Sequence, residues 1–395
     1  MRRNKLKIAY MVGTLNQGGL ESLVADICKR HRSLDFDVVC IYRHEGNYSE
    51  AFHSSGARMV QITCSNIGTY IYQLRKVLLA EHIDIVHAHT QSNALVCLLA
   101  LMGTSIPVIT TLHGFSFSKV NRLYRNIIYR GCKKIICVSH YQKQYYQTAW
   151  HLPEANKLEV IYNGIDFAKF DAKESIVNSE EGKVNREEGK VNSEEGKVNS
   201  EELIVNSGIQ LAMVGSFMGG RSQHVVVKSI DLLKQRGITD FDFYFIGRKT
   251  DDEPWRYDDC VRYCEEHELK HVHFMGGRKD VPSLLKAMDG FVYSTEHDTF
   301  GIAVVEAMAA GLPVIVNDWA VMREITNNGN RATLFRTEDA ADCADKMEEL
   351  INQLQHKDAS MQKHCKQIAK EVRAAFSIEK HIKELERVYD IVKSE

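Results

Sequence analysis

The feature that most restricts the fold of this chain is an alternation of short apolar runs with longer segments of helical periodicity, which occurs twice. In the first part of the chain the apolar runs lie at 7–12, 38–42, 59–62, 85–88, 108–112, 135–138 and 158–162. In the second part they lie at 211–214, 243–246, 272–274, 291–293, 314–316 and 333–335. Continuously apolar strands separated by helices are typical of a parallel sheet covered on both faces. The pattern predicts an α/β protein with two Rossmann-like domains.

An unusual insertion separates the two halves of this pattern. Residues 177–202 form a tandem seven-residue repeat, VNSEEGK with small variations. Each unit has one apolar residue and a glycine, whereas a coiled-coil seam needs two apolar positions per heptad. We therefore interpret 166–208 as a linker containing a disordered acidic repeat. It joins an N-terminal domain at 1–165 to a C-terminal domain at 209–376, with a ligand crevice expected between the carboxyl ends of their sheets.

The composition argues against several classes of protein. The formal net charge is −2 over 395 residues, which gives no basic field for a nucleic-acid partner. The ten cysteines include no CxxC pair and are expected to be free thiols in a reducing compartment. The N-terminal apolar run is short and passes into a glycine-rich turn, and no run of about 18 apolar residues occurs. We therefore expect a cytoplasmic location.

The segment STEHDTFGIAVVEAMAAGLPVIV at 294–316 carries the strongest signal for a site. A helix is predicted between Gly301 and Gly311, with Pro313 beyond it, after a strand that ends in a polar and acidic loop. The small Gly301 lets a ligand approach the backbone, and the first-turn amides and the helix dipole favour an anion. Because helical side chains tilt toward the N-terminus, the carboxylate of Glu306 is expected near the same mouth. There it can accept hydrogen bonds from sugar or ribose hydroxyls.

This segment resembles the E-x₇-E motif of retaining family 4 glycosyltransferases, which have the GT-B fold of two Rossmann-like domains facing a cleft. The resemblance covers nearly the whole chain apart from the repeat. It implies that Glu306 binds the ribose of a nucleotide and that the backbone of Phe300, Gly301 and Ile302 holds the donor diphosphate. Asp298 stands where the family has a glutamate that contacts the transferred sugar, and its shorter arm implies a different choice of sugar. A purely structural turn is the alternative interpretation.

A glycine-rich loop, VGSFMGGRSQ at 214–223, follows a strand and precedes a predicted helix. Gly215 allows a tight turn near a phosphate, and Arg221 can neutralise a diphosphate. The corresponding loop of the family usually carries an arginine after the first glycine and a lysine further on. Ser216 and Arg221 occupy these places, so one of the two cations is missing. An ordinary surface turn is the alternative.

Two further motifs follow strands of the first domain. The sequence GTLNQGGLE resembles the GG-x-E loop of the family, which implies that Gly18, Gly19 and Glu21 lie close to the donor phosphates and the acceptor. The sequence TTLHG places His113 at the carboxyl end of a strand, and the resemblance implies that it contacts the transferred sugar. The alternatives are a plain strand–helix turn and a structural histidine.

No metal site and no cofactor are expected. His87 and His89, in the sequence HAH, lack carboxylate or cysteine partners at ligand spacing, so we interpret them as structural. Cys260, Cys264 and His267 share one helical pattern without a fourth ligand and are interpreted in the same way. The resemblance agrees, because the family is generally metal-independent and uses a nucleotide-diphosphate sugar as its substrate.

Two segments concern packing and location. The final helix at 377–395 is implied by the resemblance to pack back on the first domain. The segment Arg122–Lys134 mixes basic and apolar residues, a combination that is compatible with peripheral contact with the anionic inner face of a membrane. A covering helix with a solvated basic face is the alternative.

Together these features predict a glycosyltransferase that moves a sugar from a nucleotide diphosphate to a glycan or lipid-linked acceptor with retention of anomeric configuration. The expected role is the synthesis of a cell-surface polysaccharide. The predicted catalytic residues are His113, Arg221, Asp298 and Glu306. A nucleotide-sugar 2-epimerase or a phosphorylase of the same architecture is one alternative. A degenerate protein that binds nucleotide sugars without turnover is another, supported by the departures at Ser216 and Asp298.

Overall fold

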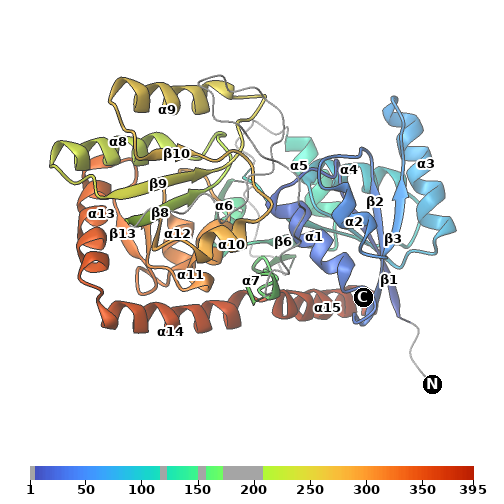
Figure 1. Ribbon diagram of the computed structural model, residues 1–395. Coiled ribbons are helices and arrows are strands. Elements are labelled where there is room, and N and C mark those ends of the chain that lie inside the picture. Colours follow the sequence, from blue (N-terminus) through green and yellow to red (C-terminus); the bar gives the residue numbers. More distant parts are fainter. Residues whose placement is uncertain (1–4, 116–121, 150–156, 172–207) are drawn as a thin grey trace, which may run out of the picture.

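The structure, a computed structural model, describes residues 5–115, 122–149, 157–171 and 208–395. They form two domains, each with a parallel sheet between layers of helices (Figure 1). This arrangement confirms the predicted α/β class. The repeat at 177–202 lies outside the described residues. Within the described ranges, no helix combines the length and hydrophobicity needed to cross a bilayer.

The first sheet has seven parallel strands in the order β3-β2-β1-β4-β5-β6-β7. In chain order these are β1 (Leu6–Met11), β2 (Phe36–Tyr42), β3 (Arg58–Gln61), β4 (Ile85–Ala88), β5 (Val108–Leu112), β6 (Lys134–Cys137) and β7 (Leu158–Val160). The direction in which strands are added reverses at β1, which pairs with β2 on one side and β4 on the other. Ligands of open α/β sheets bind beyond the carboxyl ends of the strands at such a reversal.

Helices cover both faces of this first sheet. They are α1 (Gly19–Lys29), α2 (Ser49–His53), α3 (Ile67–Ala80), α4 (Gln91–Ala100), α5 (Arg122–Gly131) and α6 (His140–Ala149). The short helix α7 (Ala168–Asp171) follows the last strand of this sheet, but its Phe170 packs in the core of the second domain. Successive residues of a strand point to opposite faces, so β1 contributes to two cores. Ile8 and Tyr10 pack with α1, and Ala9 and Met11 pack with α3 and α4.

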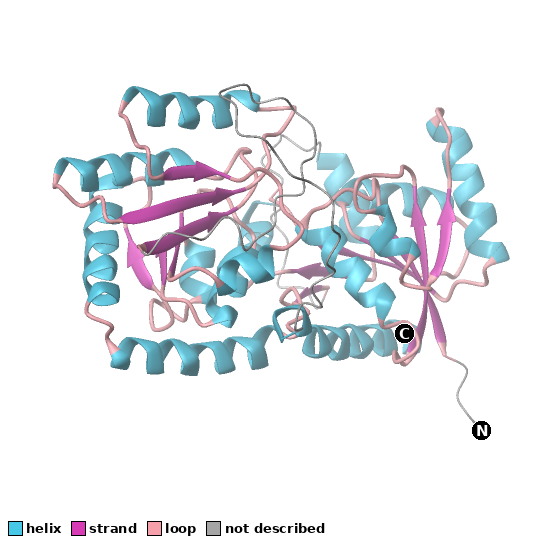
Figure 2. Cartoon of the chain, in the orientation of Figure 1, coloured by secondary structure: helices cyan, strands magenta, loops and turns pink. Residues whose placement is uncertain are grey.

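The second sheet has six parallel strands in the order β10-β9-β8-β11-β12-β13. These are β8 (Ile209–Val214), β9 (Phe241–Ile246), β10 (Val272–Phe274), β11 (Gly290–Tyr293), β12 (Val314–Asn317) and β13 (Thr333–Phe335). The reversal lies between β8 and β11. The arrowheads of β8 and β9 point toward the first domain, so the loops after these strands face the junction of the domains (Figure 2).

The helices of the second domain complete the fold. They are α8 (Gln223–Gln235), α9 (Pro254–Glu266), α10 (Val281–Lys286), α11 (Ile302–Ala310), α12 (Ala320–Ile325), α13 (Ala340–Gln355), α14 (Ala359–Phe376) and α15 (Ile378–Ser394). Helix α13 packs on α8, and α14 packs on α11.

Every predicted apolar run forms a strand, and the differences lie at the ends. Strand β2 begins at Phe36 rather than at residue 38, and β7 ends at Val160. Helix α11 lies between Gly301 and Gly311 as predicted, and both glycines have left-handed φ values, +83° and +86°. The glycines end the helix cleanly because a side chain would be strained in that conformation.

The C-terminal helices α14 and α15 run along one side of both domains (Figure 1). The chain bends at Ser377, whose hydroxyl accepts a hydrogen bond from the Lys380 amide and caps α15. Beyond the bend, Ile378, Leu385 and Val388 are buried in the core of the first domain. Helix α15 therefore belongs to the first domain by its packing, although it follows the second domain in sequence.

Candidate functional site

Two loops meet where β8 and β11 end, at the reversal of the second sheet. Arg221 forms an antiparallel bridge with Thr295, and the Ser222 amide donates to the Ser294 carbonyl over 3.1 Å. The Thr295 hydroxyl donates to the carbonyl of Gly220 over 2.6 Å. The glycine-rich loop and the acidic loop thus form one continuous surface at the carboxyl ends of the strands.

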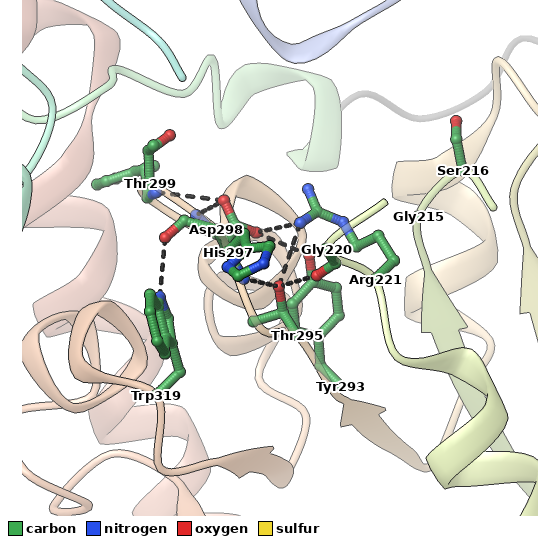
Figure 3. A network of polar contacts seen from close by, with 12 residues as sticks. Gly215, Ser216, Gly220, Arg221, Tyr293, Thr295, His297, Asp298, Thr299 and Trp319 are labelled. Carbon is green, nitrogen blue, oxygen red and sulfur yellow. Dashed lines mark hydrogen bonds and ion pairs between the residues drawn. The ribbon is translucent and has the colours of Figure 1, made fainter. Parts of the chain in front are cut away.

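The carboxylate of Asp298 is the centre of this surface (Figure 3). Its Oδ1 accepts hydrogen bonds from the Phe300 and Gly301 amides over 3.2 and 3.0 Å. Its Oδ2 accepts one from the Tyr293 hydroxyl over 2.8 Å and lies 3.1 Å from Nη1 of Arg221. Three hydrogen bonds and one ion pair thus hold this largely buried carboxylate.

The guanidinium of Arg221 is held in place by the same cluster. It lies over the ring of Tyr293, with 5.5 Å between the guanidinium carbon and the ring centroid. Burial alone would lower its pKa, but the negative charge of Asp298 raises the pKa above the usual value. Arg221 therefore presents a permanent positive charge next to the N-terminus of α11.

The bonds to Asp298 change which amides of α11 are available to a ligand. The amide of Gly301, assigned to the donor diphosphate on the resemblance, donates to Asp298 instead, as does that of Phe300. The first-turn amides of Ile302 and Ala303 make no hydrogen bond to the part of the chain that the structure describes. Glycine is required at 301 because a Cβ there would lie 2.7 Å from Cε of Met322, at a left-handed φ.

Helix α1 of the first domain begins opposite α11. A Cβ built on Gly19 would lie 2.6 Å from Cδ1 of Ile302, so the two domains come close together here. Burial raises the pKa of Glu21, two residues on, and the positive charge of Arg248 opposes that rise. The predicted Gly18–Glu21 loop thus lies at the junction, next to α11 and near a second arginine, Arg248.

Glu306 lies one turn further along α11, where charged groups on α1 and α7 act on its carboxyl group. Burial raises the pKa of its carboxyl to about 7; Lys169 of α7 opposes this rise and Asp26 of α1 adds to it. Lys169 and Asp26 form an ion pair of 2.6 Å. Glu306 itself makes no hydrogen bond to the described residues, so its oxygens are available to a ligand.

His113 lies at the end of β5 and is tied to the second domain through its backbone. Its carbonyl accepts a hydrogen bond from the Thr299 hydroxyl over 2.8 Å. Its ring Nε2 lies 3.4 Å from Nδ1 of His89. Burial lowers the pKa of His113 to about 3, so the imidazole is neutral at physiological pH.

A second contact between the domains is made by α6 and α12. The carboxylate of Glu324, on α12, accepts hydrogen bonds from the His140 and Tyr141 amides over 2.7 and 2.9 Å. These are first-turn amides of α6, so Glu324 binds the positive end of that helix. Its Oε1 also accepts a hydrogen bond from the Tyr162 hydroxyl over 2.8 Å.

The structure brings Arg221, Asp298 and the start of α11 into direct contact, and it places the other predicted residues around them. Ser216 is the exception, because no contact joins its side chain to the network (Figure 3). Gly215 lies close to Arg221, since a Cβ there would be 3.5 Å from Nε. Phe300 packs its ring in the core against Phe376, so only its backbone reaches the site.

Sequence reasoning missed four residues of the site. Tyr293 and Arg248 stand at or just after strand ends, which is a usable signal for a crevice residue. Asp26 and Lys169 have no such signal, because they meet Glu306 only through the packing of the two domains. Among the described residues, no group of three or more histidine, cysteine or acidic side chains is placed to hold a metal ion.

Two sequence families match the two domains separately. Residues 17–169 match the family described as Glycosyltransferase Family 4, and residues 208–353 match Glycosyl transferases group 1. A relative from Escherichia coli is 23% identical over 80% of each chain and is named UDP-Gal:alpha-D-GlcNAc-diphosphoundecaprenol alpha-1,3-galactosyltransferase. An uncharacterised glycosyltransferase of Methanocaldococcus jannaschii is 26% identical over 94% of each chain.

Solved structures share the fold over almost the whole chain. A glycosyltransferase from Rickettsia africae superposes with a TM-score of 0.79 at 19% identity and covers 99% of each chain. The Anabaena protein HepE, in complex with UDP and glucose, also has a TM-score of 0.79, at 16% identity over 98% of this chain and 99% of its own.

The buried histidines predict that acid destabilises the fold. Burial lowers the pKa of His113 to about 3 and that of His381 to about 4, from the ordinary 6.5. It also holds the pKa values of His87 and His89 well below 6.5. Below pH 6.5 the unfolded chain therefore binds more protons than the folded chain. The free energy of unfolding consequently decreases as the pH is lowered.

Urea denaturation at a series of pH values measures this effect. The midpoint should fall steadily below about pH 6.5, and His381→Gln should reduce the slope because one of the depressed histidines is gone. A midpoint that does not change between about pH 7 and pH 5 would contradict the prediction.

Proposed function

The chain belongs to the family 4 glycosyltransferases, and we propose that it transfers a hexose from a UDP-sugar to a lipid-linked or glycan acceptor with retention of anomeric configuration. The choice of uridine is supported by the named donor of the Escherichia coli relative and by the UDP in the Anabaena structure. The choice of acceptor is supported by relatives named for a diphosphoundecaprenol acceptor and for O-antigen biosynthesis. These relatives are named as transferases, which does not favour the alternative function of a nucleotide-sugar 2-epimerase.

The observation that carries the proposal is the convergence of positive groups at the start of α11. Arg221 supplies a fixed guanidinium, and the amides of Ile302 and Ala303 supply unpaired donors at the positive end of the helix. Such an arrangement binds a diphosphate and stabilises the charge that develops when it leaves. The missing cation at Ser216 therefore leaves Arg221 as the principal partner of the donor phosphates.

The groups around this position fit the rest of a nucleotide sugar. The oxygens of Glu306 lie further along α11 and suit the two ribose hydroxyls. His113 approaches from the first domain and suits a hydroxyl of the transferred sugar. Asp298 already accepts three hydrogen bonds from the protein and pairs with Arg221. We therefore assign Asp298 to holding Arg221 and α11 in position.

Retention fits this chemistry without a covalent intermediate. The bond from the anomeric carbon to the donor phosphate breaks while the acceptor hydroxyl bonds to the same face of that carbon. The acceptor proton passes to the departing phosphate oxygen, which needs no separate base. Arg221 and the α11 amides stabilise the negative charge on the leaving UDP. In this scheme neither a metal nor a cofactor is required, so we propose that the enzyme uses neither.

We also propose that the enzyme reaches a lipid-linked acceptor by peripheral contact through α5. Leu123 and Ile127 of α5 are 64% and 37% exposed, and Arg130 and Lys133 nearby are also exposed. Met102, after the adjoining helix α4, is 68% exposed. Exposed apolar side chains beside basic ones suit an anionic bilayer surface.

A screen of nucleotide sugars tests the activity. Purified protein is mixed with uridine, guanosine and adenosine diphosphate sugars, and binding is read as a rise in melting temperature, with release of UDP as the sign of turnover. A response to a UDP-sugar supports the proposal. Failure of every donor to bind or to release nucleotide would overturn it.

Loss of the Arg221 charge should slow the chemical step. We expect Arg221→Gln to lower kcat by about 10²–10³-fold, the usual effect of removing one group that stabilises the leaving charge. Lys286→Gln removes an exposed positive charge from the same domain and should leave kcat unchanged. Equal kcat values for the two variants, with melting temperatures like that of the wild type, would sink the assignment.

Ionisation of Glu306 should strengthen donor binding as the pH rises through about 7, the value to which burial raises its pKa. The carboxylate can accept from both ribose hydroxyls, whereas the protonated acid has one fewer lone pair to offer. Calorimetry with a UDP-sugar, whose diphosphate diester does not titrate there, should show a falling Kd in the wild type and a flat one in Glu306→Gln. The same pH dependence in both proteins would refute this role.

Vesicle flotation tests the membrane contact. The wild type should float with vesicles that contain an anionic lipid, and the double variant Leu123→Asp, Ile127→Asp should not. Leu79→Asp changes an exposed leucine on α3 and serves as the matched control. The proposal fails if the wild type stays with the soluble fraction, or if the double variant floats as well as the control.

A further inference from the structure

Two histidines from neighbouring strands meet beside the proposed sugar position. Strands β4 and β5 pair in parallel, with Ala88 opposite Thr110, so the residues after each strand end lie at the same edge of the sheet. His89 follows β4, His113 follows β5, and the two ring centroids are 5.6 Å apart. Nδ1 of His89 and Nε2 of His113 are within hydrogen-bonding distance at 3.4 Å.

The ring of His89 is fixed by its surroundings. It stacks on His87, with centroids 4.4 Å apart and planes at 24°, and it meets Tyr10 edge-on at 5.1 Å. His87 is fixed in turn, because its ring nitrogens each lie 2.7 Å from a hydroxyl, those of Tyr389 and Thr111. His89 therefore reaches His113 from a rigid base that includes α15.

The tautomer of His89 follows from its burial. The residue is only 2% exposed, and burial keeps its pKa well below the usual value, so the ring is neutral and carries one proton. Its Nε2 is buried without a partner among the described residues. A buried N–H without an acceptor is rarer than an unpaired acceptor, so the proton belongs on Nδ1. His89 then donates to Nε2 of His113.

Donation by His89 also decides where His113 carries its own proton. Burial keeps the pKa of His113 at about 3, so this ring too is neutral and has a single proton. Because Nε2 accepts from His89, that proton must be on Nδ1. Nδ1 of His113 has no partner in the described part of the chain, and the residue is partly exposed at the domain junction.

We propose that His89 is a positioning residue that fixes His113 in the Nδ1–H tautomer, so that His113 offers a hydrogen-bond donor to an oxygen of the transferred sugar. The donor role of His113 rests on the proposed function, whereas the tautomer rests on the geometry and burial of the two rings and does not depend on that function. His89, which the sequence suggested to be structural, thereby controls the polarity of a sugar contact without touching the sugar.

Nitrogen NMR reads the tautomer without any substrate. In protein with ¹⁵N-labelled histidine, a long-range ¹H–¹⁵N spectrum separates pyrrole-type from pyridine-type nitrogens. The His113 signals are identified by their loss in His113→Gln. A pyrrole-type Nδ1 and a pyridine-type Nε2 on His113 support the proposal, and the reverse pattern overturns it whether or not the enzyme is a transferase.

Kinetics separate positioning from a merely structural role. His89→Phe keeps an aromatic ring but loses the donor, and His89→Asn places an amide N–H near the position of Nδ1. We expect His89→Phe to lower kcat/KM about 3- to 10-fold, the usual effect of one neutral hydrogen bond, without changing the Kd for UDP, and His89→Asn to recover most of the loss.

A double-mutant cycle completes the test. Once His113→Ala has removed the side chain that His89 positions, adding His89→Phe should lower kcat/KM no further. Losses that multiply in the double variant would assign His89 to the fold and overturn the proposal. A changed Kd for UDP in His89→Phe would also overturn the proposal, because UDP does not contain the transferred sugar.

Discussion

The paired carboxylate of Asp298 is the constraint on which the rest of the site depends. It joins three elements at the reversal of the second sheet: Tyr293 at the end of β11, Arg221 in the loop after β8, and the amides before α11. A buried carboxylate is tolerated only when its oxygens are paired, so each of these groups is held by the need to satisfy the others. The cost of the buried charge is offset by its pairing with Arg221, the residue proposed to stabilise the leaving phosphate.

The bonds to Asp298 also determine which groups of each domain remain available to a ligand. Because Asp298 satisfies the Phe300 and Gly301 amides internally, the second domain offers a ligand its next amides, those of Ile302 and Ala303, together with Arg221. These groups suit a diphosphate but supply few contacts to a neutral hexose. In the proposed function, recognition of the sugar then depends more on the first domain, which the Thr299–His113 hydrogen bond holds against the second.

The sequence was a good guide to elements and a partial guide to contacts. Apolar runs report burial directly, so all the strands and the helix between Gly301 and Gly311 could be predicted. The internal use of Asp298 was also signalled, because aspartate readily bonds the amides two and three residues ahead of it. The ion pair of Lys169 with Asp26 next to Glu306 could not be predicted, because it exists only once the two domains have packed together.

The hydrogen bonds of His87 and His89 can be understood from the need to keep His113 neutral beside the charged pair of Arg221 and Asp298. If His113 carried a positive charge, it would add to the field of Arg221 and compete for the donor phosphates. Burial beside two other neutral imidazoles prevents that charge, and the contact with His89 then leaves the ring only one way to place its proton. In the proposed function, His113 thus contributes a directed dipole rather than a charge, and a dipole suits a sugar hydroxyl rather than the anionic diphosphate next to it.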